Sequence, residues 1–87
     1  MTDYPTIVAF LSDPNAPERP IIPPGGSCGP KDDDHMTHLA MIVRRQKDRP
    51  AQIDILRRQA ELLESLAPGD PCVARMLQWH GELVGAR

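Results

Sequence analysis

Residues 50–67, PAQIDILRRQAELLESLA, decide the fold. One line of apolar residues recurs there at spacings of three and four, the period of an amphipathic helix. This line is Ile53, Leu56, Ala60, Leu63 and Ala67, and a second line beside it is Ile55, Leu62 and Leu66. Together they cover about half of the circumference, more than the stripe of an ordinary surface helix. We therefore expect a central helix over 50–67 that contacts neighbours on two sides.

Proline and glycine signals border this helix at both ends. Pro50 breaks the preceding helix and suits the first turn of the next one. After residue 67, Gly69 can close the helix and Asp70 can cap another that has Pro71 in its first turn. These signals predict two further helices, over 32–49 and 71–85.

Both flanking helices have one apolar face. Three aspartates, Asp32 to Asp34, suit the positive end of the first helix. Its apolar face is Met36, Leu39, Ala40, Ile42 and Val43. The face of the last helix is Val73, Met76, Leu77, His80 and Val84, with Cys72, Trp79 and Leu83 along its edge. The predicted fold class is all-α, a small three-helix bundle or helical hairpin over 32–87.

Residues 1–31 form a proline-rich N-terminal arm that we expect to be extended and separate from the helical domain. Seven of the ten prolines fall in the first thirty residues. The apolar segment at 6–11 fits either a short helix or a strand. Residues 14–19 have the P-x-x-P-x-basic form of ligands for aromatic grooves. We favour an arm lying on its own helices or on a second subunit, with Ile21, Ile22 and the cluster at residues 7–11 buried, because these apolar residues need cover.

Charge is unevenly distributed along the chain. The 87 residues have a net charge of −2, which argues against general attraction to nucleic acid. Residues 44–58, however, hold six bases and two acids, a net charge of +4. The six bases, called the basic patch below, are Arg44, Arg45, Lys47, Arg49, Arg57 and Arg58. They could contact phosphates, but the patch lacks the aromatic residues used for base stacking.

No residue pattern indicates catalysis or a cofactor. The chain lacks G-x-S-x-G, H-E-x-x-H and glycine-rich phosphate-loop motifs, so we expect no enzyme and no cofactor. Cys28, His35 and His38 could approach one another and bind zinc, but no standard ligand-pair spacing is present. We predict no metal site and leave this zinc alternative open. With two cysteines, no signal peptide and no long apolar run, we expect a cytoplasmic protein without a membrane partner.

The apolar excess of helix 50–67 favours a binding protein. We expect a small regulatory adaptor or inhibitor that binds a larger protein as a homodimer, with the basic patch steering an acidic partner. Small proteins of this class are common in bacteria and phages, which is an analogy of size and not a resemblance in sequence. The expected contact residues are Ile55, Leu62, Leu66, Trp79 and Leu83. The alternative is a nucleic-acid-binding transcriptional regulator that uses the basic patch.

Overall fold

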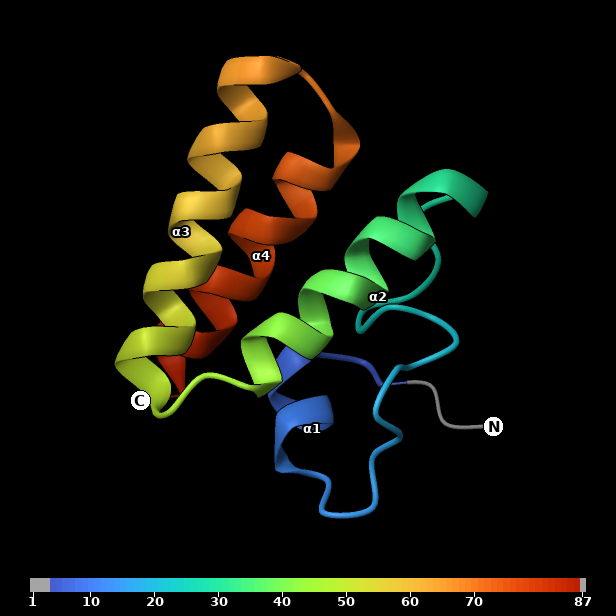
Figure 1. Ribbon diagram of the computed structural model, residues 1–87, viewed down its shortest axis with the longest axis vertical. Helices are drawn as coiled ribbons and strands as arrows, with labels where there is room; N and C mark the ends of the chain where they lie inside the picture. Colours follow the sequence, from blue (N-terminus) through green and yellow to red (C-terminus); the bar gives the residue numbers. More distant parts are fainter. Residues whose placement is uncertain (1–3, 87) are drawn as a thin grey trace.

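The computed structural model describes residues 4–86, which form helices and no strand (Figure 1). Helix α1 spans Ile7–Ser12 and α2 spans Pro30–Arg44, while α3 spans Arg49–Leu66 and α4 spans Pro71–Gly85. The predicted all-α class and small helical bundle are therefore confirmed. The apolar segment at 6–11, for which helix and strand were equally open, belongs to a helix.

Side-chain caps explain where three of the helices begin. Thr6 Oγ1 accepts a hydrogen bond from the Ala9 amide at 3.0 Å, and Asp48 Oδ1 accepts one from Ala51 at 3.0 Å. Asp70 Oδ1 accepts one from Cys72 at 2.8 Å. Each cap satisfies an amide of the first turn that has no partner within its helix. Gly69, with φ of +84°, adopts the left-handed conformation that lets the chain turn away after α3.

The largest boundary error concerns α2, which was predicted over 32–49. The helix begins at Pro30, because proline fits the first turn of a helix. It ends at Arg44, five residues early, and residues 45–48 form the connection to α3. Asp48 must be extended to cap α3 (φ −151°, ψ 177°), so the helix cannot continue through it. The helices predicted over 50–67 and 71–85 are found within one residue of these limits.

Helices α3 and α4 form an antiparallel hairpin that makes the most extensive contact in the fold. Helix α2 crosses this hairpin at an angle, close to α3 at the 45–48 turn and diverging from it toward Pro30 and Leu66 (Figure 1). Helix α1 packs against α4. Helix α3 was expected to contact neighbours on two sides. It packs closely against α4, whereas its contact with α2 is slight.

The N-terminal segment, predicted as an extended arm, forms α1 and completes the core, in line with the expected burial of the cluster at residues 7–11. Ile7 and Phe10 of α1 are fully buried in the same cluster as Met36, Leu56 and Trp79. The rings of Tyr4 and Phe10 meet edge to face, with centroids 5.2 Å apart. A core of helices 32–85 alone would be thin, and α1 thickens it. No domain boundary at residue 31 is visible in the packing.

The proline segment lies across the bundle, with Pro20, Pro23 and Pro24 fully buried. The Trp79 indole Nε1 donates a hydrogen bond to the Pro24 carbonyl oxygen at 3.0 Å. Arg75 Nη1 also donates to this oxygen, at 3.0 Å. The expectation that the segment lies on its own helices agrees with this arrangement. The expected burial of Ile21 is wrong, since its side chain is 77% exposed.

Replacing Phe10 with alanine tests whether residues 4–31 belong to the core. We expect Phe10→Ala to lower the free energy of unfolding by about 3–5 kcal/mol, the usual cost of such a cavity. The matched control Ile21→Ala should change it by less than about 0.5 kcal/mol, because this side chain is exposed. Urea denaturation followed by circular dichroism measures both. Equal stability of Phe10→Ala and the parent chain would show that α1 does not belong to the core.

Candidate protein-binding surfaces

A shallow apolar groove lies where α2 and α3 diverge. Leu62 is 53% exposed and Leu66 is 74% exposed, so both leucines face solvent. They border a hollow of about 130 Å³. The residues that line it, called the α2–α3 groove below, are His35, Gln59, Leu62, Leu63 and Leu66. Adjacent exposed leucines beside a partly buried one make this a surface on which an apolar side chain could bind.

The five predicted contact residues do not share one surface. Leu62 and Leu66 belong to the α2–α3 groove, and Ile55 is half-buried on the same line of α3. Trp79 and Leu83 are completely buried, so their prediction as surface contacts is wrong. The sequence placed them along the edge of the last helix, but α1 and the proline segment cover that edge. The predicted contact residues that remain accessible all lie on α3.

Internal partners occupy most of the basic patch. Arg44 Nη1 donates to the carbonyl oxygens of Ala16 and Pro17, at 3.1 and 2.8 Å, and its guanidinium lies over the Phe10 ring. Arg45 pairs with Glu18 at 3.0 Å. Arg44 thus fastens the N-terminal segment to α2.

Two further bases of the patch pair along α3. Arg57 Nε lies 3.2 Å from Glu61 and Arg58 Nε lies 3.0 Å from Asp54, both at i,i+4 spacing. Among residues 4–86, Lys47 and Arg49 are the members of the patch whose side chains have neither an ion pair nor a hydrogen bond. Arg49 Nη1 is also buried without a hydrogen-bond partner in this part of the chain. The available positive charge is confined to the 45–48 turn and the start of α3.

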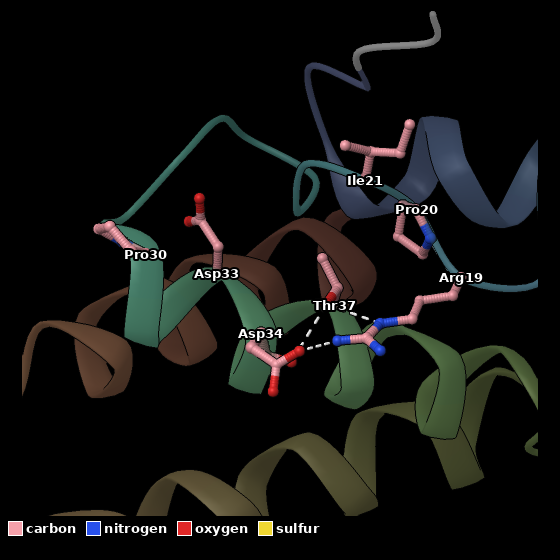
Figure 2. A pocket seen from close by; sticks show the side chains of 7 residues that line it. All are labelled: Arg19, Pro20, Ile21, Pro30, Asp33, Asp34 and Thr37. Atoms are coloured by element: carbon pink, nitrogen blue, oxygen red, sulfur yellow. Dashed lines mark hydrogen bonds and ion pairs between the residues drawn. The ribbon is translucent and has the colours of Figure 1, made fainter.

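A second hollow, of about 370 Å³, lies between the proline segment and the start of α2 (Figure 2). The Arg19 guanidinium binds the Asp34 carboxylate and points its Nε toward Thr37 Oγ1 at 3.4 Å. Asp33 accepts hydrogen bonds from Ser27 Oγ at 2.6 Å and from the Cys28 amide at 2.5 Å. These bonds lower the pKa of the Asp33 carboxyl, the Ser27 bond most strongly. The charged side chains that line this hollow already bind other groups of the chain. They hold the proline segment against α2.

These contacts also bear on the P-x-x-P-x-basic reading of residues 14–19. Arg19, its basic residue, is held by α2, and the neighbouring Pro20 is buried. In this conformation the basic residue of such a ligand is already paired within the chain.

Among residues 4–86, Cys28, His35 and His38 do not form a group of converging ligand atoms for zinc. In residues 4–86 the side chains that converge as three ligand groups are instead Asp32, Asp70 and Cys72, whose ligand atoms lie within 4.8 Å of one another. Asp70 is already engaged as the cap of α4. This cluster joins the starts of α2 and α4, and its sequence separation kept it out of the sequence-based predictions.

The Cys72 thiol is held in its protonated form. Burial, together with the neighbouring Asp32 and Asp70 carboxylates that favour the neutral thiol, raises its pKa to about 12. The pKa of Cys28 is also raised by burial, which Arg75 partly opposes. A nucleophilic cysteine needs a lowered pKa, so the environment of Cys72 is opposite to that of a catalytic thiol.

Comparison of the chain with family models, curated proteins and solved structures finds no match in any of the three. In the part of the chain that the structure describes, no helix combines the length and apolar character needed to cross a bilayer. Function must therefore be argued from the surfaces themselves.

The raised pKa of Cys72 predicts selective thiol chemistry. At pH 7 a thiol of pKa 12 is ionised to only about one part in 10⁵, so the folded chain should react at Cys28 long before Cys72. Labelling with iodoacetamide followed by peptide mass spectrometry measures both sites, and a denatured sample is the control in which both react. Equal labelling of the two cysteines in the folded chain would show that Cys72 is not buried as described.

Because internal partners occupy four of the six patch bases, we expect no tight binding to nucleic acid. Titration of mixed-sequence duplex DNA at low salt should give no complex at micromolar protein. Binding that weakens steeply with added salt would show that phosphates displace these partners. Such a result would support the transcriptional regulator.

Proposed function

We propose that this protein is a small non-enzymatic adaptor or inhibitor that binds a larger protein through the α2–α3 groove. The observation that carries the proposal is the exposure of Leu62 and Leu66 together, one helical turn apart. Single exposed apolar residues are ordinary, but a pair beside an apolar hollow is typical of a binding surface.

The shape of the groove favours an amphipathic helix as the bound element. Helices α2 and α3 diverge toward Pro30 and Leu66 (Figure 1), and the hollow of about 130 Å³ at this end could take an apolar side chain from a helix lying on the surface. Such a helix would place apolar residues at i, i+3 and i+4 against Leu62, Leu63 and Leu66. It would complete a packing layer that α2 and α3 do not complete alone.

Charge adds an orientation to this helix. Lys47 in the 45–48 turn has no ion pair among residues 4–86, so a carboxylate of the partner could pair with it there. The opposite end of α2 begins with Asp32 and Asp33 in its first turn. The partner helix should therefore have acidic residues near the turn and basic residues near the start of α2.

Substitution of the two leucines tests this function. We expect a partner captured from native cells to lose affinity at least about tenfold for Leu62→Glu and Leu66→Glu, because each buries a charge against an apolar helix. The control is Ile21→Glu, which places the same charge on an exposed apolar residue outside the groove. Circular dichroism should show unchanged helicity in all three variants.

The captured protein must also satisfy the chemistry of the site. A synthetic peptide of its amphipathic helix should bind the parent chain and shift the NMR signals of residues 55–66. A partner that binds Leu66→Glu as well as the parent chain, or a peptide whose shifts fall elsewhere, would contradict the proposal.

A further inference from the structure

A second apolar surface runs along α4, on residues that the sequence had assigned in part to the core. Leu77 is 53% exposed and Val84 is 39% exposed. Ala74 and Gly81 are also exposed. These four residues, called the α4 stripe below, have the 3-4-3 spacing of a helix-packing seam. The stripe contains no charged residue, and nothing lies within 4 Å of where a Gly81 side chain would begin.

The order of side chains along the stripe is complementary to itself. When two copies of α4 lie antiparallel about a two-fold axis beside residue 79, Ala74 faces Val84 and Leu77 faces Gly81. Each large side chain then meets a small one, as interdigitated helix packing requires. A parallel arrangement would instead place Leu77 on Leu77 and leave an empty space at Gly81.

Charges on α3 follow the same symmetry. Arg57, Glu61 and Glu64 line a hollow with Leu77 and His80, so these α3 side chains border the α4 stripe. The two-fold axis that pairs the stripes sets the two α3 helices antiparallel on the same side of the interface. Arg57 of one copy then lies opposite Glu61 and Glu64 of the other. Opposite charges meet twice, once for each half of a symmetric interface.

We propose that the α4 stripe is a homodimer interface, in which α3 and α4 of two copies form an antiparallel four-helix layer. The occupant is a second copy because both size and charge alternate in the order that a two-fold axis demands. This interface replaces the one expected around Trp79, which is buried within the chain. Contact through two helices per copy is small, so we expect a dissociation constant of roughly 1–100 µM.

The dimer is independent of the proposed function and adds to it. Leu62 and Leu66 lie on the line of α3 that borders α2, whereas Arg57 and Glu61 lie on its border with α4. Both α2–α3 grooves therefore remain open in the dimer. A partner with two binding helices, or a dimeric partner, would meet two grooves at once and gain avidity.

Sedimentation equilibrium of the full chain tests the interface, at roughly 5–500 µM to span the expected dissociation constant. The parent chain should pass from a 9.7 kDa monomer to twice that mass. Leu77→Asp should weaken the dimer at least about tenfold, since it buries a charge in the seam. Ile21→Asp, the matched exposed control, should leave the dimer unchanged.

Gly81→Leu separates loss of association from loss of folding. The position has open space in the monomer, and leucine favours a helix more than glycine does. The variant should thus unfold at a higher urea concentration than the parent chain. It should also remain monomeric, because Leu77 of the second copy has no space left.

The remaining outcomes decide between the surfaces. Leu66→Glu should keep the dimer while it loses the partner of the α2–α3 groove, so the two proposals fail separately. A parent chain that stays at 9.7 kDa throughout, or variants Leu77→Asp and Gly81→Leu that dimerise like it, would overturn the interface. A dimer lost only in Leu66→Glu would assign the second copy to the α2–α3 groove instead.

Discussion

The structure depends on the burial of Trp79 beneath the proline segment. Its indole is the largest fully buried side chain, and its Nε1 donates to the Pro24 carbonyl oxygen. A buried indole needs such an acceptor. The Pro24 carbonyl oxygen is available because this residue lies outside the helices, where no helical amide uses it. This one contact joins α4 to a segment 55 residues earlier in the chain.

Several local features follow from that contact. Arg75 donates to the Pro24 and Gly26 carbonyl oxygens and closes the loop over the tryptophan. Gly25 has φ of +95°, and a side chain there would begin 3.0 Å from Arg75 Nη1. Glycine is required by both its conformation and its close approach. The loop thereby covers Trp79 and removes it from the surface.

The helices could be predicted from sequence because their signals are local. Asp48 lies two residues before Pro50 and Asp70 lies directly before Pro71, and the apolar period of 50–67 specifies its own buried face. The place of residues 4–31 could not be predicted in this way. Proline and glycine indicate a break in regular structure. They do not indicate that Trp79 and Arg75 will bind the carbonyl oxygens of that loop.

The same distinction explains the errors at the candidate sites. The Asp54–Arg58 pair follows from i,i+4 spacing, whereas the Arg45–Glu18 pair requires the fold. Counting bases in residues 44–58 therefore overestimated the free positive charge. Trp79 and Leu83 lie on the edge of an apolar helix face, and periodicity alone cannot tell whether such an edge meets the same chain or another.

The remaining exposed apolar residues are not explained by folding. Polar residues such as glutamate and lysine have helix propensities close to that of leucine, so Leu62, Leu66 and Leu77 add little to helix stability where they stand. A small chain with a thin core gains nothing from leaving apolar area in water. Among residues 4–86, four of the five large exposed apolar side chains lie on α3 and α4. Leu62 and Leu66 belong to the α2–α3 groove, and the other two belong to the α4 stripe. Two contacts with other chains account for that distribution better than chance placement on a monomer.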